Sequence, residues 1–501
     1  MFKKILIANR GEIALRIIRT CHDMGIQSVA VYSEVDRKSP FVYSAYEAYP
    51  LGGKTSQESY LQAQKIIDIA LKCGAEAIHP GYGFMSENAD FADAVENAGL
   101  VFIGPKGSSI RIMGNKTAAR KLMIANKVPT VPGTEDAITD PLKAQEIAQV
   151  IGYPVLIKAA AGGGGKGMRL VEHDNDFIEA VQGASREAKA AFNDAAVYIE
   201  KFVEEPRHIE FQVLADAFGN VVHLGERECS IQRRHQKIIE EAPSSILDKK
   251  IRAEMGEAAI NAAKACNYQN AGTIEFLVDK ERNFYFLEMN TRLQVEHPVT
   301  EMVNGLDLVE EQIHIAAGAK LRVKQSTESF WGHAFECRLY AEDPENNWAP
   351  SPGIIEYLNA AKGPGVREDS GVTKGSEISL YYDPMISKLC VWGKDRDQAI
   401  RRMLRALREY EISGIKTSIP FLIRVFENTK FKKGEFTTAF IEENKLGLFG
   451  ENKQFAEIAA IAAILKQIEE KDKAGLVQTM QNGVLKSQWK TAHRKQILRS
   501  R

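Results

Sequence analysis

Apolar and polar positions along the first 114 residues follow an alternation of strands and helices. The apolar run of residues 3–8 (KKILIA) predicts a buried parallel strand. Residues 12–25 (EIALRIIRTCHDMG) have the spacing of an amphipathic helix that ends at a glycine, and residues 27–33 (QSVAVYS) predict the next strand. Later segments repeat this order, with a helix near residues 60–72 and strands at AEAIH and GLVFIGP. We therefore predict a doubly wound α/β domain over residues 1–114.

Beyond Pro129 and Pro132 the pattern changes to a succession of strands. YPVLIKAA, MRLVEHD and AVYIEKFV each predict a strand, and residues 207–214 and 219–225 predict an antiparallel pair. TIEFLVDKERNFYFLEMN has two β-rich runs around a polar turn, which is the pattern of a hairpin. We therefore predict that a mixed α+β region follows the α/β domain.

Charge and composition exclude several classes of partner. Lys and Arg total 65 and Asp and Glu total 66, so the formal net charge of -1 points neither to nucleic acid nor to an anionic membrane surface. No apolar run approaches the roughly 18 residues of a membrane-spanning helix, and the N-terminal run is too short for a secretory signal. Six scattered cysteines without a C-x-x-C pair are typical of reduced thiols. We therefore expect a cytoplasmic protein with no nucleic-acid or membrane partner.

A glycine-rich segment lies between two of the predicted strands. Gly162, Gly164 and Gly167 fit the pattern G-x-G-x-x-G, but the lysine before Gly167 is not followed by Ser or Thr, so this is not a Walker A loop. Because a strand rather than a helix follows, we interpret the segment as the tip of a β-hairpin that closes over nucleotide phosphates. Lys158 in the preceding strand can add a positive charge there. A plain surface loop is the alternative.

Two glutamates lie on opposite arms of the predicted hairpin. If the hairpin closes symmetrically around residues 281 and 282, Glu275 faces Glu288, and Asn290 shares the face of Glu288. Carboxylates that face each other on a sheet repel, and a divalent cation reverses that effect. Two carboxylates and an amide oxygen suit Mg²⁺, with nucleotide phosphates completing its shell. Solvated acids on an exposed edge are the alternative, which the apolar flanking residues disfavour.

Two charged segments have no unique interpretation from spacing alone. Arg292 and Glu296 follow the hairpin, where an arginine fork suits a planar oxyanion such as bicarbonate and a carboxylate can serve as a general base. A surface salt bridge explains the same spacing equally well. Residues 232–237 (QRRHQK) are flanked by acids, which is typical of a solvated face, although a phosphate pocket is also compatible with them.

Six motifs together resemble those of biotin carboxylases, which are members of the ATP-grasp superfamily. They are IANRGEIA (7–14), HPGYGFMSEN (79–88), KAAAGGGGKGM (158–168), ERECSIQRRHQKIIEEAP (226–243), EMNTRLQVEHPVTE (288–301) and ECRLYAEDP (336–344). The resemblance covers residues 1 to about 446. It implies the domain order 1–114 (N-terminal α/β), 115–330 (ATP-grasp, with a glycine-rich lid at 131–203), 331–446 (C-terminal α+β) and 447–501 (helical and basic extension).

The resemblance also implies a role for individual residues. The residues implied to contact ATP are Lys116, Lys158, Gly162, Gly163, Gly164, Gly165, Lys166, Gly167, Glu200, Lys201, Val203, His208, His235, Glu275 and Glu288. Mg²⁺ or Mn²⁺ is implied at Glu275, Glu288 and Asn290; bicarbonate at Lys237, Arg292, Gln294 and Val295; and biotin at Tyr82 and Arg338. The implied catalytic residues are Lys237, Arg292, Glu296 and Arg338.

The chemistry implied by the resemblance begins with Glu296, which takes the proton of bicarbonate. The carbonate oxygen then attacks the γ-phosphate of ATP to give carboxyphosphate, which breaks down to CO₂ and phosphate. Phosphate removes the proton from the ureido nitrogen of biotin, and Arg338 stabilises the resulting oxyanion.

The chain contains no Ala-Met-Lys-Met type of biotin attachment segment. The resemblance therefore implies that biotin arrives on a separate biotin carboxyl carrier protein, that a carboxyltransferase is a further chain, and that this chain forms a homodimer. The final acceptor (acetyl-CoA, another acyl-CoA, pyruvate or 2-oxoglutarate) stays open. Two alternatives are another ATP-grasp ligase, such as a carbamoyl-phosphate-forming enzyme, and a non-catalytic nucleotide-binding subunit.

The resemblance fades in the C-terminal tail. Residues 456–468 have an apolar helical pattern, and residues 486–501 are basic and contain Trp489. Tryptophan and arginine are favoured at interface hot spots, so docking of the carrier or transferase subunit is one hypothesis. A helix that packs on its own domain, followed by a solvated basic end, is an equally good one.

Overall fold

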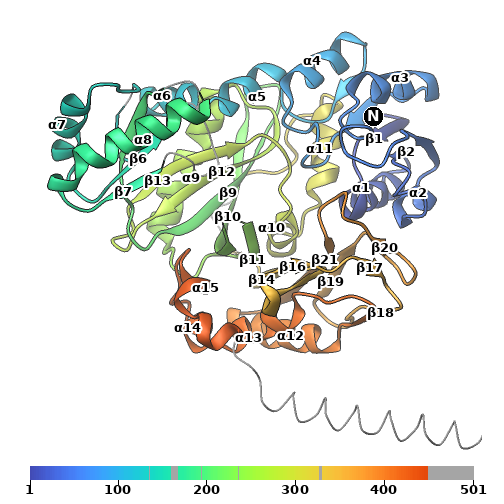
Figure 1. Ribbon diagram of the computed structural model, residues 1–501. Coiled ribbons are helices and arrows are strands. Elements are labelled where there is room, and N and C mark those ends of the chain that lie inside the picture. Colours follow the sequence, from blue (N-terminus) through green and yellow to red (C-terminus); the bar gives the residue numbers. More distant parts are fainter. Residues whose placement is uncertain (135, 160–167, 193–194, 235, 326–329, 450–501) are drawn as a thin grey trace, which may run out of the picture. The chain divides into compact units, whose positions relative to one another are not determined.

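The computed structural model describes residues 1–449 except residues 135, 160–167, 193–194, 235 and 326–329 (Figure 1). The chain divides into two units, Met1–Leu448 and Phe449–Arg501, and the fold given below is that of the first. The glycine-rich loop, His235 and the tail beyond residue 449 lie outside the described residues, so the expectations for them remain predictions. Within the described ranges, no helix is long and apolar enough to cross a membrane.

The N-terminal residues form a five-stranded parallel sheet in the order β3-β2-β1-β4-β5. Its strands are β1 (Lys4–Ile7), β2 (Gln27–Tyr32), β3 (Glu47–Pro50), β4 (Ala77–His79) and β5 (Val101–Phe102), and its helices are α1 (Gly11–Asp23), α2 (Pro40–Ser44), α3 (Ala63–Cys73), α4 (Ala89–Asn97) and α5 (Gly107–Gly114). Ile5 and Ile7 pack in one core with α1, whereas Leu6 packs in a second core with α3 and α4. Both faces are therefore covered by helices, and the predicted doubly wound domain is confirmed.

A small antiparallel sheet, β7-β6-β8, follows. Its strands are β6 (Val155–Ala159), β7 (Arg169–Val171) and β8 (Val197–Lys201), and α6 (Lys116–Ala125), α7 (Pro141–Ile151), the short 3-10 turn η1 (Asp174–Asp176) and α8 (Phe177–Phe192) belong to the same region. Val155 and Ile157 of β6 pack against Ala148 of α7 and Phe177 of α8. Since β6 and β7 pair antiparallel, the predicted hairpin on either side of the glycine-rich loop is confirmed.

An eight-stranded antiparallel sheet, β13-β12-β9-β10-β11-β14-β21-β19, is the largest sheet of the described residues. Its strands are β9 (Arg207–Ala215), β10 (Val221–Arg233), β11 (Gln236–Ala242), β12 (Asn270–Val278), β13 (Phe284–Asn290), β14 (His333–Tyr340), β19 (Val366–Ser370) and β21 (Met385–Gly393). The helix α9 (Lys249–Ala265) packs on β9 and β12. Because β11 pairs with β14, the sheet runs without a break past residue 330, where the resemblance implies a domain boundary.

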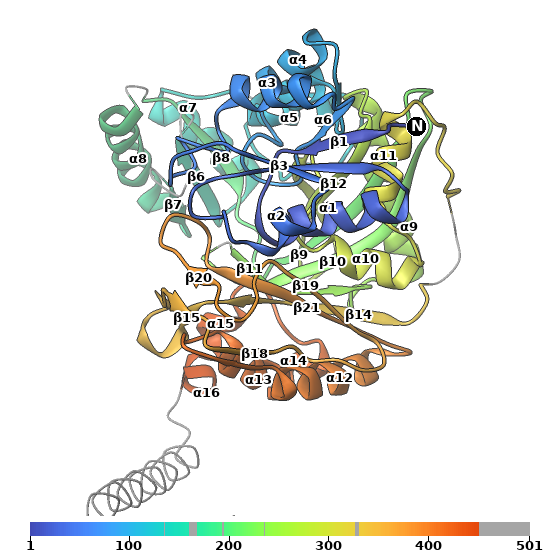
Figure 2. The same ribbon diagram turned by 90° about the vertical axis from the view of Figure 1, so that its right-hand side faces the viewer.

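The remaining elements complete the C-terminal region. They are α10 (His297–Asn304), α11 (Leu308–Ala316), β15 (Glu342–Asp343), η2 (Pro344–Asn346), β16 (Ala349–Pro350), β17 (Gly353–Ile354), β18 (Tyr357–Asn359), β20 (Glu377–Ile378), α12 (Arg396–Glu409), β22 (Glu411–Ser413), α13 (Ile419–Glu427), α14 (Thr429–Lys433), α15 (Phe440–Glu443) and α16 (Lys445–Phe449). Figure 2 shows α12 and α13 along one side of β14 and β21, with the N-terminal sheet on the other side.

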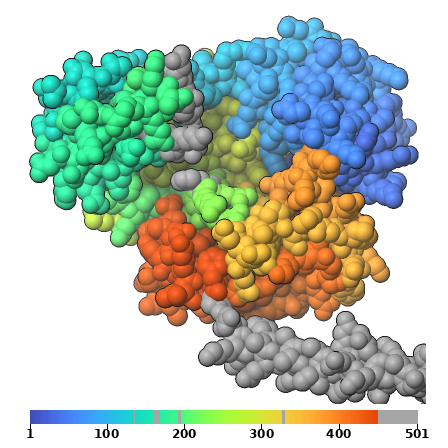
Figure 3. Space-filling view, viewed as in Figure 1, coloured from blue at the N-terminus to red at the C-terminus, as the bar shows by residue number. Residues whose placement is uncertain are grey.

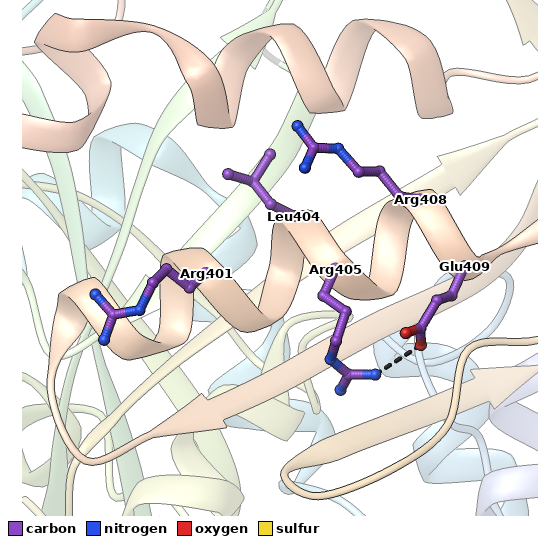
Figure 4. A pocket seen from close by; sticks show the side chains of 5 residues that line it. All are labelled: Arg401, Leu404, Arg405, Arg408 and Glu409. Atoms are coloured by element: carbon purple, nitrogen blue, oxygen red, sulfur yellow. Dashed lines mark hydrogen bonds and ion pairs between the residues drawn. The ribbon is translucent and has the colours of Figure 1, made fainter.

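The helix α12 shows how its sequence selects its buried face. Ile400, Met403 and Leu407 recur at helical spacing and are buried, and the Asp395 side chain caps the first turn. Arginines occupy the outer face, where Arg405 donates a hydrogen bond to Glu409 at 2.6 Å (Figure 4). The residues drawn in Figure 4 line a shallow groove, and all of them come from α12. The groove lacks the several acids and bases from neighbouring strands that meet on the large sheet.

Candidate active site

Charged side chains from neighbouring strands of the large sheet meet on the face opposite α9. In Figure 3 the viewed face is hollowed between the blue N-terminal residues, the green residues of the small sheet and the orange C-terminal residues. Strand alternation explains the arrangement, because Ile209 and Phe211 of β9 enter the apolar core while Glu210 between them points to the other face. The charged cluster, as it is called below, consists of Glu210, Arg227, Lys237, Glu240, Glu275, Glu296 and Arg338.

Lys237 on β11 is the hub of the charged cluster. Its ammonium bonds the carboxylate of Glu210 and lies 2.8 Å from Glu275 Oε1 and 2.7 Å from Glu296 Oε1. Burial alone would lower the pKa of Lys237, but the three carboxylates raise it well above its usual value. Lys237 therefore remains a cation where a small anion could replace one of its carboxylate partners.

Glu296 is held from two sides. Arg338 on β14 donates to Glu296 Oε2 at 2.9 Å, opposite Lys237 on Oε1. Burial would raise the pKa of Glu296, but Lys237, Arg338 and Arg227 lower it well below its usual value, so the side chain is a carboxylate at neutral pH. Arg338 also donates through Nε to Glu240 at 2.7 Å, and burial raises the pKa of Glu240 to about 7.

Arg227 is fully buried and balances the acids beneath the site. Its guanidinium donates to Glu210, to Gln212 Oε1 at 2.8 Å, and to the hydroxyls of Thr300 and Thr273 at 2.9 and 3.1 Å. Because every nitrogen of the guanidinium has a partner, this buried charge meets the condition under which a protein can retain one.

Arg292 and Gln294, for which the resemblance implies a role at bicarbonate, lie beside the charged cluster. Arg292 Nη1 donates to Gln294 Oε1 at 2.9 Å and Nη2 donates to Asn290 Oδ1 at 3.0 Å, while Gln294 donates to Glu275 at 3.1 Å. The third arm of the arginine, Nε, donates to Glu87 Oε2 at 2.8 Å. Sequence reasoning missed Glu87, although it lies within the motif at residues 79–88.

The acidic hairpin has the expected facing pair. Glu275 on β12 pairs directly with Glu288 on β13, and the amide of Asn290 donates to Glu275 Oε1 at 2.8 Å. The register differs nearer the turn, where Phe276 pairs with Phe286, so a bulge at Leu287 separates the two halves of the hairpin. The assumed symmetric closure around residues 281 and 282 was therefore wrong, although the pairing inferred from it is confirmed.

The two facing carboxylates differ in a way that fits a cation site. Burial, and next the charge of Glu275, raise the pKa of Glu288, and among the described residues no hydrogen bond or ion pair is recorded for the Glu288 carboxylate. Although burial would raise the pKa of Glu275, Lys237 and His208 lower it, and His208 Nε2 lies 2.7 Å from Glu275 Oε2. The facing acid raises the pKa of the Glu288 carboxyl group, and a divalent cation between the two side chains would stabilise its ionised form. The residues therefore fit Mg²⁺ or Mn²⁺.

Apart from Glu275 and Glu288, the described residues expected to bind ATP lie on or just after the small sheet, on α6 and on β9. Lys158 on β6 forms an ion pair with Glu200 on β8, and Lys116 begins α6 close enough to Glu288 to lower its pKa. The ammonium of Lys201 donates instead to the backbone carbonyls of Gly152 and Tyr153, at 3.0 and 2.8 Å. Val203 is buried just after β8, and His208 lies on β9.

Tyr82, expected at the biotin side, donates its hydroxyl to the carboxylate of Glu12 in α1. Glu12 Oε1 in turn lies 3.2 Å from the ammonium of Lys388 on β21. Glu12 belongs to the motif IANRGEIA, but neither Glu12 nor Lys388 was given a role from the sequence. Nothing in local spacing connects residues 12, 82 and 388, which only the folded chain brings together.

Comparison with known proteins gives three adjoining family matches. The biotin carboxylase N-terminal domain matches residues 1–110, the ATP-binding domain of the carbamoyl-phosphate synthase L chain matches residues 115–324, and the biotin carboxylase C-terminal domain matches residues 336–443. The two outer matches are to domains of biotin carboxylases, and the central match alone is to a domain described for carbamoyl-phosphate synthase.

Individual relatives agree with these matches. The chain is 55% identical over 442 residues to biotin carboxylase of Nostoc sp., covering 88% of this chain and 99% of that protein. It is 49% identical over 444 residues to the 2-oxoglutarate carboxylase small subunit of Hydrogenobacter thermophilus, covering 89% and 94%. The biotin carboxylase domain dimer of the same organism's 2-oxoglutarate carboxylase, solved with MgADP, ADP and bicarbonate, superposes with a TM-score of 0.82 at 49% identity, covering 89% and 99%. The chain with this charged cluster therefore belongs to the biotin carboxylase family of ATP-grasp enzymes.

Proposed function

We propose that the charged cluster binds bicarbonate and uses it, with ATP, to carboxylate biotin. As a member of the biotin carboxylase family, the chain is an ATP- and bicarbonate-dependent ligase. The observation that carries the assignment of the site is the position of the Glu296 carboxylate between Lys237 and Arg338. A base beside two fixed cations suits proton removal from an anion and the stabilisation of the charge that develops next.

Nucleotide binding is assigned to the small sheet and its surroundings. Lys116 and Lys158 supply charges for the phosphates, Glu200, Lys201 and Val203 line the adenine side, and His208 with His235 and the Gly162–Gly167 loop complete the set. Glu275, Glu288 and Asn290 would hold Mg²⁺ or Mn²⁺. When bound, that ion neutralises the phosphates for phosphoryl transfer.

Bicarbonate is assigned to Lys237, Arg292, Gln294 and Val295. Arg292 is already bound on three sides, so it presents its planar guanidinium in a fixed orientation. Glu296 takes the proton of bicarbonate, and the carbonate oxygen attacks the γ-phosphate to form carboxyphosphate. For this to happen Lys237 must turn from Glu296 toward the anion, which raises the pKa of Glu296 and makes it a better base.

Biotin is assigned to the side of the cluster formed by Tyr82 and Arg338. Carboxyphosphate breaks down to CO₂ and phosphate, phosphate takes the ureido proton, and Arg338 stabilises the negative charge on the ureido oxygen. Glu240 keeps the guanidinium of Arg338 oriented, since it bonds Nε while Nη2 reaches Glu296.

Similarity to relatives supports a proposal for the assembly. Relatives of the chain include subunits of multisubunit carboxylases, and a related biotin carboxylase domain was solved as a dimer. We propose a cytoplasmic homodimer that receives biotin from a separate biotin carboxyl carrier protein and serves a carboxyltransferase on a further chain. In this arrangement the biotin side is supplied by residues 1–114 and the nucleotide side by residues 115–330. Arg338 is supplied by residues 331–446.

The test is ATP hydrolysis by the purified chain. ADP release in the presence of Mg²⁺ should require bicarbonate and should rise when free biotin is added. Equal rates with and without biotin in active enzyme would contradict the proposal, and ADP release without bicarbonate would show that another acceptor is used.

A further inference from the structure

Lys388 is a buried cation to which the assigned mechanism gives no part. It lies on β21 directly opposite Arg338 on β14, and its side chain is 0% exposed. Residues directly opposite in an antiparallel pair share a face of the sheet, and like charges in such positions repel. The chain thus retains two neighbouring cations at a place where one of them is needed for the chemistry.

The ammonium of Lys388 has two partners from distant parts of the chain. It donates to the backbone carbonyl of Val295 at 2.8 Å and lies 3.2 Å from Glu12 Oε1. Burial alone would lower the pKa of Lys388, but Glu12, Glu336 and Asp369 raise it, so the side chain is charged. Burying such a charge costs free energy that a methionine of similar length would not require.

The Val295 carbonyl belongs to the peptide that joins Val295 to Glu296. A hydrogen bond to this oxygen therefore fixes the orientation of the planar Val295–Glu296 peptide. It thereby also fixes the direction in which the Glu296 side chain leaves the backbone, just before α10 begins. On the other side, Glu12 accepts the hydroxyl hydrogen of Tyr82, and the ring centre of Tyr82 lies 5.9 Å from the ammonium. The bicarbonate side and the biotin side are thus connected by a series of contacts through Val295, Lys388, Glu12 and Tyr82.

We propose that Lys388 is a positioning residue that holds the Val295–Glu296 peptide and, through Glu12, the Tyr82 side of the site in one fixed relation. Its contacts align bicarbonate and biotin with each other without touching either. The inference rests on the proposed function, because it concerns the geometry of the same site. A misplacement of about 1 Å at a reacting centre can reduce a rate by roughly 10²-fold. The benefit of alignment for the rate therefore explains why the chain retains a buried charge here.

A purely structural ion pair would behave differently from a positioning residue. Removing one partner of a buried pair is strongly destabilising, whereas replacing both partners by neutral groups is often tolerated. Lys388→Met combined with Glu12→Gln therefore restores charge balance and leaves the Val295 carbonyl without its donor. Stability and catalysis separate in this double variant only if Lys388 acts by positioning.

The experiment compares wild type, Lys388→Met, the double variant, and Lys65→Met as a control. Lys65 also donates to a backbone carbonyl, that of Leu51, but lies in α3 away from the charged cluster. For each protein the melting temperature, kcat, the KM for bicarbonate, the KM for ATP, and the ADP released per carboxybiotin are measured.

Lys388→Met should melt at a lower temperature than wild type, and the double variant should recover most of that loss. In both, we expect kcat/KM for bicarbonate to fall on the order of 10²-fold and the ratio of ADP to carboxybiotin to rise, with the KM for ATP within about twofold. Lys65→Met should keep wild-type kinetics. If Lys388→Met does not fold, the double variant decides alone.

A double variant that regains both stability and wild-type bicarbonate kinetics would overturn the inference and leave Lys388 as a structural ion pair. If the double variant does not fold, Lys388→Arg, which keeps the buried charge but moves the donor, takes its place, and wild-type kinetics in it would overturn the inference equally. A wild type that shows no bicarbonate-dependent carboxylation of biotin would instead refute the proposed function itself.

Discussion

Arg338 donates a hydrogen bond to Glu296 at 2.9 Å, although 42 residues of sequence separate the two. The assigned base and the assigned oxyanion stabiliser are therefore in contact before any substrate binds. Glu240 holds Arg338 from the other side, so its guanidinium cannot simply turn away when Glu296 changes partner. Oriented charges of this kind need little reorganisation during the reaction.

Glu296→Gln tests this pairing. The amide cannot take the proton of bicarbonate, so biotin carboxylation should fall roughly 10²–10³-fold, which is the usual scale for one such group. ATP affinity should change little, because Glu296 is assigned to bicarbonate and not to the nucleotide. Steady-state carboxybiotin formation and nucleotide titration measure the two effects. Glu427→Gln, which removes a surface partner of Arg408, is the matched control and should keep the wild-type rate. A loss of nucleotide affinity as large as the loss of rate would refute the assignment.

Glu288→Gln tests the cation site. Glu288 faces Glu275, and replacing it with an amide removes one of two carboxylates that a divalent cation would bridge. The Mg²⁺ concentration needed for half-maximal turnover should rise at least roughly tenfold, a change typical of weakened metal coordination. Glu281→Gln changes an exposed acid in the turn of the same hairpin, between β12 and β13, and should leave the Mg²⁺ requirement unchanged. An unaltered requirement in Glu288→Gln would count against the site.

Glu241 predicts a pH-dependent part of the stability. It lies 2.7 Å from Arg396 and 2.6 Å from His333; burial would raise its pKa, but these partners lower it from 4.5 to about 2. Because the folded pKa is the lower one, the ionised form stabilises the fold above about pH 4.5 and this contribution is lost as the pH falls toward 2. At neutral pH it amounts to about 3 kcal/mol.

Glu241→Gln should therefore unfold at a lower urea concentration than wild type at neutral pH. The difference between the two proteins should shrink as the pH is lowered from about 4.5 to about 3.5, since the wild-type carboxylate gradually loses its advantage. Urea unfolding at several pH values measures this. A difference that stays constant with pH would mean that the effect of the substitution comes from packing rather than from charge.

Elements that bury an apolar face of their own were predictable from the local sequence. Alternation and helical spacing identified β1, α1 and the β12–β13 hairpin, because each is stabilised by its own buried face. The pairing of Glu275 with Glu288 could be inferred from the turn, but the bulge at Leu287 could not, since a bulge leaves no fixed signal in apolar alternation.

Long-range contacts of the site were beyond the same reasoning. Lys237 and Glu240 on β11 both serve the cluster although strict alternation would place them on opposite faces. An irregularity at Ile238, between the pairs Gln232–Lys237 and Ile231–Ile239, accounts for this. Lys388 and Glu12 are further examples, because their contact depends on how the sheet containing β19 and β21 packs beside α1 and carries no mark in either segment.

Transfer of the carboxyl group from bicarbonate to biotin is measured most directly with an isotope label. The purified chain is incubated with ATP, Mg²⁺ and labelled bicarbonate, together with free biotin or, in a parallel sample, with ammonia. Label should enter carboxybiotin only when ATP is present, in an amount matching the additional ADP released when biotin is added, and ammonia should capture none. Label in carbamoyl phosphate, or a rise in ADP release on adding biotin without labelled carboxybiotin, would contradict this assignment.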